Sequence, residues 1–275
     1  MTQPDEWAGP EVSPPAQCGE ARIVPHCTTP IPDPSPQGGG KKWAEISIAG
    51  ITAVADPGGA LYWPREGLLV VADLHLEKGS SFAARGVLLP PYDTAETLAR
   101  LAGVMAHYAP RAVIALGDSF HDGDGPARLA PADRDALREL QRGRDWFWIA
   151  GNHDPEPATG VGGTPAAALA IGVLTFRHEP EPIAAEQDGA GESLGEIAGH
   201  LHPVARVGGR GRTVSRRCFA GDGHRLVMPA FGAYAGGLNV RDRAFARVFG
   251  LGNIVAHVLG EGRVYAIAAA RCLAD

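Results

Sequence analysis

Residues 68–75 read LLVVADLH, an unbroken apolar run that ends in an aspartate and a histidine. A run of this length and composition predicts a buried strand, which we place at residues 67–72. In extended backbone, side chains two residues apart point to the same side, so Asp73 and His75 can grip one cation while Leu74 faces away. Taken alone, an Asp-x-His triplet is more often an exposed aspartate and histidine at the end of a strand. The stretch therefore predicts a strand, and a metal site only if other ligands join it.

The chain on either side of this run has the pattern of an α/β domain. From about residue 43, short runs of Val, Ile and Leu alternate with longer stretches at helical spacing. We predict helices at 92–108, with Asp93 or Thr94 as the N-cap, and at 131–141. The Gly-rich segments 160–163, 187–192 and 208–211 are predicted to be loops. The predicted strands are 45–54, 67–72, 112–116, 146–150, 173–176, 196–198, 213–219, 226–228 and 263–268.

The first 42 residues differ from the rest of the chain. They are dense in proline, end in Gly38-Gly39-Gly40 and show neither helical nor strand periodicity. Such a segment cannot bury enough apolar surface to offset the entropy lost on ordering. We therefore expect a disordered Pro/Gly-rich tail over residues 1–42 and one folded domain over 43–275.

Composition and charge limit the class of protein. The 275-residue chain is 45% hydrophobic with a net charge of -6, so it can bury a sizeable core and has no global positive field to draw it onto nucleic acid. Any contact with nucleic acid must be local. The four cysteines form no CxxC pair, no apolar run is long enough to span a membrane, and the N-terminus has no secretory pattern. We expect reduced thiols, no membrane association and a cytoplasmic location.

Two further predicted strands end in polar residues that suit a metal site. Gly117-Asp118 combines a glycine that permits a tight turn with a carboxylate whose two oxygens can bridge two cations. In the tetrapeptide 151–154, GNHD, the amide oxygen of Asn152 can ligate a cation, and His153 then lies close to the metals without having to bind one. Asp154 could orient that imidazole and favour its protonated form. The tetrapeptide is the more specific of the two signals.

The last two clusters are histidines. His178 follows the strand predicted at 173–176, and a lone histidine is usually structural. His200 and His202 follow the strand predicted at 196–198, and two imidazoles one residue apart at a strand end are a strong signal for metal binding. Nearly all five clusters fall directly after a predicted strand, where open α/β sheets place their ligands. Chance explains each cluster by itself but not the five together, so the sequence predicts one shared site.

The ordered motifs, DxH at 73–75, GD at 117–118, GNHD at 151–154, His178 and GHxH at 199–202, resemble the calcineurin-like metallophosphoesterase superfamily. That resemblance implies an α/β four-layer fold, in which two mixed sheets pack together with helices outside, and two divalent metal ions. The donors are only O and N atoms, which suits Mn, Fe or Zn, and among these the resemblance favours Mn as the expected metal. By the same resemblance, Asp73, His75 and His202 would hold the first ion, Asn152, His178 and His200 the second, and Asp118 would bridge them.

The chemistry that this resemblance implies is hydrolysis of a phosphoester. Two cations about 3.5–4 Å apart lower the pKa of a bridging water, so that hydroxide can attack phosphorus in line. His153 would protonate the departing alkoxide, which is worth about 10²–10⁴ in rate, and Asp154 would support it. His153 and Asp154 are therefore the candidate catalytic residues.

The residues that flank the motifs bear on the substrate. ADLHLEK at 72–78, His121-Asp122 and MPAFG at 228–232 resemble the PdeM group, the ligase-associated DNA damage response endonucleases. This narrower resemblance implies a DNA phosphodiester as substrate, with a DNA ligase and a helicase as companions in repair. The candidates for contact with the substrate are Lys78, Arg85 and His121. Six arginines after the last motif could meet a phosphate backbone or form a solvated basic hairpin, namely Arg206, Arg210, Arg212, Arg216, Arg217 and Arg225.

Two other functions stay open at this point. The same metal chemistry in a closed pocket would suit a phosphatase or phosphodiesterase for a small nucleotide. A non-catalytic scaffold that binds protein partners is the less favoured alternative, because a scaffold would be expected to lose ligands and this chain keeps every one of them.

Overall fold

A computed structural model describes residues 21–22, 43–156, 160–182, 195–209, 212–250 and 254–275. The predicted tail lies outside these residues, except that β1 (Ala21–Arg22) pairs with β9 (Ala168–Ile171). The loop predicted at 187–192 also lies outside them. In the described part of the chain, no helix is long and apolar enough to cross a membrane.

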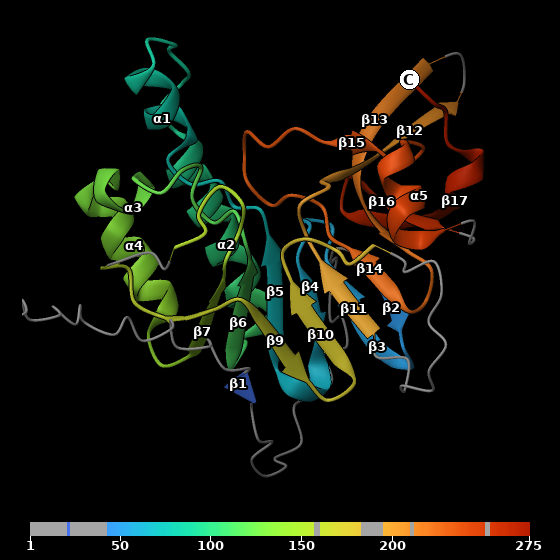
Figure 1. Cartoon of the computed structure of the whole chain (residues 1–275), viewed down its shortest axis with the longest axis horizontal. Coiled ribbons are helices and arrows are strands. Elements are labelled where there is room, and N and C mark those ends of the chain that lie inside the picture. The colour runs from blue at the N-terminus through green and yellow to red at the C-terminus, as the bar shows by residue number, and fades with distance from the viewer. Residues whose placement is uncertain (1–20, 23–42, 157–159, 183–194, 210–211, 251–253) are drawn as a thin grey trace, which may run out of the picture.

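The first sheet contains seven strands, and its second half is parallel. The carboxyl ends of β5 to β8 therefore lie along one edge of the sheet (Figure 1). In order across the sheet, the strands are β2 (Ala44–Ile48), β3 (Ile51–Ala55), β4 (Leu61–Trp63), β5 (Leu68–Ala72), β6 (Ala112–Leu116), β7 (Asp145–Ile149) and β8 (Thr164–Ala166).

The single strand predicted at 45–54 is wrong, because β2 and β3 form an antiparallel hairpin there. The chain turns at Ala49-Gly50, where both residues have positive φ angles of 48° and 79°. A continuous β-rich composition conceals this turn, since only one glycine marks it.

The second sheet is mixed and contains ten strands. Its parallel pair β10–β11 again brings two carboxyl ends together. Besides β1 and β9, the strands are β10 (Leu174–Arg177), β11 (Gly195–Ala198), β12 (Pro203–Gly209), β13 (Arg212–Gly221), β14 (Arg225–Val227), β15 (Leu238–Asn239), β16 (Val255–Gly260) and β17 (Arg263–Ala268). Gly208 and Gly209, which we predicted to be loop residues, are the end of β12.

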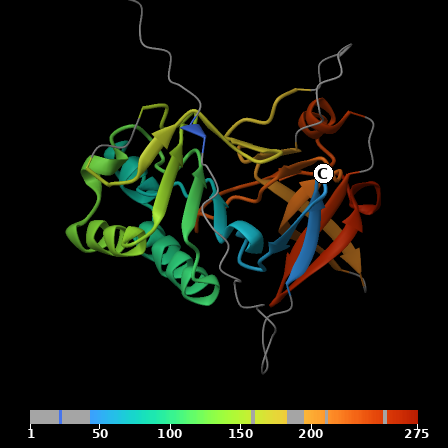
Figure 2. The ribbon, with the colours of Figure 1, turned by 90° about the horizontal axis from the view of Figure 1, so that it is seen from below.

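The helices lie outside the two sheets, as Figure 2 shows from below. Both predicted helices are present, and three α-helices that we did not predict are short. The α-helices are α1 (Lys78–Ala84), α2 (Asp93–Tyr108), α3 (Gly125–Arg128), α4 (Pro131–Gln141) and α5 (Arg243–Phe249), and the 3-10 helices are η1 (Pro64–Glu66) and η2 (Ala269–Arg271).

The predicted N-cap of α2 is wrong. Tyr92 occupies the cap position without a side-chain cap hydrogen bond. Asp93 accepts a hydrogen bond from the backbone amide of Gly79 at 3.0 Å, and Thr94 accepts one from the amide of Glu77 at 2.8 Å. These two side chains therefore stabilise the start of α1, directly after the first metal motif.

Three apolar clusters show the layer order. One cluster lies between the sheets and joins alternate residues of β5 and β6, such as Val70 and Ile114, to Phe176 of β10. A second joins the opposite faces of the same strands to α2, and a third packs α5 against the other side of the second sheet. The fold is thus an α/β four-layer arrangement of helices, sheet, sheet and helix, as the resemblance implied.

Candidate metal centre

The predicted ligands lie together where strands of both sheets end. Asp73 follows β5, Asp118 follows β6 and Asn152 follows β7, all in the parallel half of the first sheet. His178 follows β10, and His200 with His202 follows β11, in the second sheet. Because parallel strands end at a common edge, residues far apart in sequence become neighbours.

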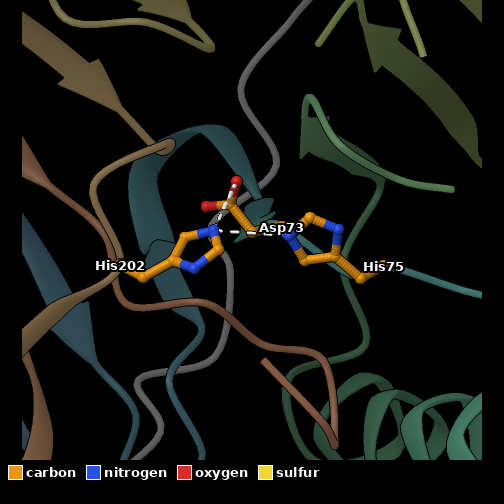
Figure 3. A group of neighbouring side chains, drawn as sticks. All are labelled: Asp73, His75 and His202. Atoms are coloured by element: carbon orange, nitrogen blue, oxygen red, sulfur yellow. Dashed lines mark hydrogen bonds and ion pairs between the residues drawn. The ribbon is translucent and has the colours of Figure 1, made fainter. Parts of the chain in front are cut away.

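The first group of possible ligands is Asp73, His75 and His202, whose ligand atoms lie within 4.8 Å of one another. Nε2 of His202 is 3.2 Å from Oδ1 of Asp73 and 3.4 Å from Nε2 of His75. Figure 3 shows the two imidazoles and the carboxylate pointing toward one another. Two aromatic nitrogens facing each other across so short a gap can share one cation.

The second group is Asp118, His178 and His200, to which the structure adds Asn152. Oδ1 of Asn152 is 2.9 Å from both Nε2 of His178 and Nδ1 of His200, and these two nitrogens are 3.2 Å apart. Nε2 of His178 is also 3.4 Å from Oδ1 of Asp118. All four side chains predicted for the second ion or the bridge therefore converge.

Asp118 lies between the two groups. Its Oδ1 faces His178, and its Oδ2 is 4.0 Å from Nε2 of His75 in the first group. A carboxylate with one oxygen toward each group has the placement that a bridging ligand needs.

The charges of the site fit divalent cations. Asp73 is fully buried and Asp118 is 2% exposed, and among the described residues the only ion-pair partners of either carboxylate are histidines. Two buried carboxylates without a Lys or Arg partner are costly unless a cation neutralises them. Nδ1 of His75 is likewise buried without a hydrogen-bond partner in the described chain.

His178 shows how the ligand atoms are oriented. Its Nδ1 lies 3.0 Å from the backbone carbonyl of Leu116 and donates to it, which leaves the lone pair of Nε2 facing the carbonyl oxygen of Asn152 and the carboxylate of Asp118. Three acceptors pointing at one another repel unless a proton or a metal ion lies between them. A backbone hydrogen bond that fixes the ring is the usual support for a metal-binding histidine.

In the metal-free chain, protons partly replace the metal ions between these acceptor atoms. Burial lowers the pKa of His178, but the hydrogen bond to Asp118 and the charges of Asp73 and Asp118 outweigh it and raise the pKa to about 9. Burial raises the pKa of Asp118, yet the hydrogen bond and charge of His178 and the amide of His153 bring it down to about 2. For His75, burial is the main cause, with the charge of His202, of a pKa lowered to about 3.

Backbone strain is concentrated in the same residues. Five of the seven predicted ligands have positive φ angles: Asp73 at 53°, His75 at 44°, Asp118 at 43°, His200 at 68° and His202 at 45°. Non-glycine residues in this region cost of order 1–3 kcal/mol each and cluster at functional sites. The amide of His75 donates to the carbonyl of Asp118 at 2.9 Å, and the amide of His200 donates to the carboxylate of Asp73, so hydrogen bonds hold the strained turns.

His153 lies at the open rim of the centre, with 41% of its side chain exposed. Its backbone amide donates to Oδ1 of Asp118 at 2.9 Å, and its Nε2 is 4.0 Å from Oδ2 of Asp118. Its Nδ1 lies 3.0 Å from the backbone carbonyl of His121, and the two rings stack with centroids 5.2 Å apart. Since Nδ1 donates to that carbonyl, Nε2 is the atom free to carry a proton toward a substrate.

Asp154 does not orient the His153 ring, contrary to our expectation. Its buried carboxylate accepts hydrogen bonds from the amides of Gly151 at 3.2 Å and Phe120 at 3.0 Å. It therefore shapes the loop that carries Asn152 and His153, while the carbonyl of His121 orients the imidazole.

The residues predicted to contact substrate lie on one side of the centre. Lys78 donates to the carbonyl of Tyr234 at 3.0 Å, and the exposed Arg85 donates to Oγ of Ser81 at 2.8 Å and covers the ring of Phe82. The ring of Phe82 in turn lies 5.5 Å from that of His121. His121 touches His75 and His153, so it belongs to the wall of the centre.

The arginine-rich stretch does form a hairpin, β12–β13. Arg217 donates to the carbonyl of Ala230 and Arg225 to those of Glu181 and Val248, so these two are used within the fold. Arg212 and Arg216 are exposed on β13. Arg206 bonds the carbonyl of Ala274 at 3.2 Å, and Arg210 lies outside the described residues.

One supporting segment was not identified as part of the site from its residues. The amide of Phe231 donates to the carbonyl of Ala72 at 2.8 Å, and that of Gly232 to the carbonyl of Asp73 at 3.1 Å. A Cβ on Gly232 would lie 2.3 Å from the carbonyl oxygen of Leu74, so only glycine fits. The sequence Pro-Ala-Phe-Gly at 229–232 could have indicated this contact, because a glycine in an apolar run often marks a close backbone approach.

Comparisons with known proteins give the family of the chain and two similar solved structures. A sequence model of the calcineurin-like phosphoesterases matches residues 68–221. The crystal structure of the Pseudomonas putida nuclease MPE is similar with a TM-score of 0.60 at 25% identity, covering 82% of this chain and 100% of that one. YfcE, a phosphoesterase from E. coli, aligns with a TM-score of 0.37 at 15% identity, covering 74% of this chain and 98% of that one.

A search of curated proteins gave no match. The family match spans more than half of the 275 residues, and all seven predicted ligands lie within it. The chain belongs to the calcineurin-like phosphoesterase family.

Proposed function

We propose that the chain is a dinuclear-metal phosphodiesterase that acts as a DNA endonuclease in repair. The observation that carries this proposal is the pair of ligand groups with Asp118 between them and His153 at the open rim. As in the PdeM group, a DNA ligase and a helicase are the proposed companions.

The metal ions, when bound, supply positive charge that activates a water and stabilises the phosphoryl oxygens. The residues of the chain perform the other tasks. Asp73 and Asp118 would provide the buried negative charge that holds the cations, and His75 and His178 would offer their Nε2 atoms as ligands, His178 once its proton is displaced. His153 donates a proton from Nε2 to the departing oxygen, because its Nδ1 is held by the carbonyl of His121.

Mn is the proposed metal, and Fe or Zn are the alternatives. The donors are carboxylate and amide oxygens and imidazole nitrogens, and the described site holds no thiolate. This donor set suits Mn, Fe and Zn better than copper or an iron–sulfur cluster. Metal analysis of the purified protein decides among the three.

Two observations support nucleic acid as the substrate. The solved structure with a TM-score of 0.60 is described as a nuclease. The exposed Arg212 and Arg216 lie on the β12–β13 hairpin, which rises with α1 on the same side of the molecule as the strand ends that carry the site (Figure 1). A basic hairpin at that edge can hold a phosphate backbone even though the whole chain is acidic.

The deciding experiment compares Mn-dependent hydrolysis of single-stranded DNA, double-stranded DNA, mononucleotides and bis(p-nitrophenyl) phosphate. Cleavage of DNA with a higher kcat/KM than of the mononucleotides supports the proposal. Turnover of mononucleotides alone would identify a small-nucleotide enzyme instead. The absence of any Mn-, Fe- or Zn-dependent hydrolysis by a metal-loaded protein would indicate a scaffold.

A further inference from the structure

The crossing loop, residues 228–237, runs from β14 of the second sheet past the end of β5 in the first sheet and on to β15. It forms a parallel bridge between its Ala230 and Ala72, the last residue of β5. Figure 1 shows this loop in orange, reaching from β14 toward α1. The crossing loop therefore contacts the first sheet at the point where Asp73 leaves β5.

The crossing loop holds the backbone of Asp73. Asp73 has a φ of 53°, and its carbonyl accepts a hydrogen bond from the amide of Gly232 at 3.1 Å. The amide of Phe231 donates to the carbonyl of the preceding residue, Ala72, at 2.8 Å. A non-glycine residue keeps a positive φ only where its surroundings impose it. The position of the Asp73 carboxylate, and with it the first group of ligands, therefore depends on where the crossing loop lies.

Three cationic side chains from three different elements donate to carbonyls of the crossing loop. The pairs are Arg217 of β13 with Ala230 at 2.8 Å, Arg100 of α2 with Phe231, and Lys78 of α1 with Tyr234 at 3.0 Å. In the part of the chain that the structure describes, none of the three cations forms an ion pair with a carboxylate. Hydrogen bonds from charged donors are about twice as strong as neutral ones, so these contacts fix the loop firmly.

The two arginines depend on the loop in return. Both are half-buried. Burial lowers the pKa of Arg100, and burial together with the charge of Arg100 lowers the pKa of Arg217 to about 10. Two such cations without a carboxylate partner are costly unless fixed acceptors compensate them. The crossing loop supplies the carbonyls, and the ring of Phe231 lies 4.7 Å from Cζ of Arg100.

We propose that Arg100 and Arg217 are positioning residues for the first metal ion. Neither belongs to a group of ligands. The arginines hold the crossing loop, the loop holds the backbone of Asp73, and Asp73 would hold the ion with His75 and His202. This inference rests on the metal centre of the proposed function.

The effect should be confined largely to one of the two ions. Among the described residues, no ligand of the second group, Asp118, Asn152, His178 or His200, forms a hydrogen bond with the crossing loop. A loop that is released from its arginines therefore disturbs Asp73 first. A general loss of stability would not select between the two ions.

Titration of Mn into the chelator-treated, full-length protein by calorimetry tests the proposal without any turnover. Arg100→Met removes the charge and the donors of the side chain. It is expected to weaken one of the two Mn equivalents at least about tenfold, because the loss of a group that supports a ligand typically costs 10–100-fold in metal affinity. Arg217→Met should act in the same direction. The weakened equivalent should be the one that His202→Ala loses, because His202 belongs to the first group alone.

Arg144→Met is the matched control. Arg144 is also half-buried and donates to the carbonyls of Pro110 at 3.2 Å and Leu140 at 3.1 Å. It precedes β7, at the opposite end of that strand from Asn152. Its replacement removes comparable hydrogen bonds and should lower the Tm, but both Mn equivalents should bind as in the wild type.

Two further variants test the loop if Arg100→Met does not fold. Arg100→Lys keeps a charged donor on α2 and should bind the first ion more tightly than Arg100→Met or, where that variant is unfolded, nearly as tightly as the wild type. Thr97→Val removes the hydroxyl that accepts from the amide of Ala233 at 3.0 Å, so it loosens the same loop without removing a charge. It should weaken the same Mn equivalent.

Three results would overturn the proposal. The first is equal Mn binding by the wild type, Arg100→Met and Arg217→Met, and the second is equal weakening of both equivalents. The third is weaker binding of single-stranded DNA by the metal-free variants with unchanged Mn binding, which would show that the arginines contact the substrate. A wild type that binds neither Mn, Fe nor Zn would refute the metal centre itself. Two bound Mn ions without hydrolysis of DNA would refute the proposed function and leave the role of the arginines intact.

Discussion

At the scale of the residue, Asp118 is the side chain that contacts both ligand groups of the site. One of its oxygens faces His178 and the other faces His75, and the amide of His153 donates to it. Its 2% exposure means that no water compensates a change in its charge. The loss of this charge therefore affects both groups of ligands at once.

Asp118→Asn tests that role. The amide has a similar shape but carries no negative charge, so we expect binding of the second metal equivalent to weaken and hydrolysis of bis(p-nitrophenyl) phosphate to fall by at least about 10³-fold, the scale of losing one metal's charge stabilisation. Metal content by mass spectrometry and steady-state rates measure the two effects. Asp122→Asn is the matched control and should keep both metals, because the carboxylate of Asp122 pairs with Arg128 and accepts from the amide of Asp124 and belongs to neither ligand group. Full activity of Asp118→Asn would contradict a bridging role.

His153→Ala separates proton donation from metal binding. We expect the variant to keep its metals, because His153 belongs to neither ligand group and its Nε2 is 4.0 Å from the nearest carboxylate oxygen of Asp118. Turnover should fall about 10²–10⁴-fold for poor leaving groups such as alkoxides and far less for p-nitrophenolate. A series of phosphodiesters with leaving groups of increasing pKa measures this dependence. Loss of metal from the variant would show that His153 is a ligand and not an acid.

At the residue scale, the sequence predicted which side chains meet but not how each one is held. The ligands could be found because Asp, Asn and His directly after apolar runs are placed by the strands. The support of the His153 ring could not be found, since it is a backbone carbonyl of His121, and every residue has one. Asp154 was misassigned because adjacency in sequence says nothing about which way a buried side chain points.

At the scale of the element, the turns between strands and ligands matter as much as the ligands. Gly117 has a φ of 69°, and a Cβ there would lie 2.4 Å from the ring of His178. The turn after β6 and the histidine after β10 are therefore fitted to each other across the two sheets.

Gly117→Ala tests this fit. The methyl group should displace His178, reduce the metal content toward one ion per chain and lower activity at least about tenfold, since small misplacements of catalytic groups are costly. Gly86→Ala is the matched control, because Gly86 also has a positive φ, of 80°, but open space around its Cβ position. Both variants carry the backbone strain of about 1 kcal/mol, so only the steric effect differs. Equal metal content in the two variants would contradict the displacement of His178.

The β12–β13 hairpin is the element on which recognition of DNA is expected to depend. Arg212→Gln with Arg216→Gln should lower kcat/KM for single-stranded DNA and leave bis(p-nitrophenyl) phosphate unaffected, because the two arginines are exposed and lie outside the ligand set. Each lost phosphate contact should reduce the slope of log affinity against log salt by about 0.7. Arg138→Gln on α4, whose exposed arginine pairs with Asp135, serves as the control. An unchanged salt dependence of the hairpin variant would exclude the hairpin from DNA binding.

Elements were predictable where one pattern dominates. The long helix α2 and the apolar strands β5, β6 and β7 were found within about two residues because each buries a full face or both faces. The hairpin of β2 and β3 was merged into one strand, and three-residue β4 was missed, since short antiparallel pieces owe their form to their neighbours.

At the scale of the whole molecule, the two sheets are joined at the metal centre as well as in the core. Apolar residues of both sheets meet between them, and at the edge of this interface Asp73 from one sheet meets His202 from the other. Sequence periodicity could indicate each sheet's strands but not this pairing, because contacts between sheets leave no local pattern. The resemblance to a family supplied that step.

The stability of the whole molecule should therefore depend on what occupies the centre. In the metal-free chain, His178 has a pKa raised to about 9, above the 6.5 of an unperturbed histidine. A raised pKa adds stability that is fully present below pH 6.5 and is lost as the pH rises through 9. His75 and Asp154, with pKa values of about 3 and about 6, titrate mainly below this window.

We accordingly expect the chelator-treated protein to lose stability between pH 6.5 and 9, with a slope of at most about 1.4 kcal/mol per pH unit for one proton. Urea unfolding at several pH values measures the slope, and His178→Gln should flatten it. With saturating Mn the sign should reverse, because metal binding displaces the proton of His178 and strengthens as the pH rises, and a ligand that binds only the folded state stabilises it. Two results would contradict a proton on His178 that replaces the metal ion. One is an equal slope of unfolding free energy against pH for the wild type and His178→Gln without metal, and the other is a slope of the same sign with and without Mn.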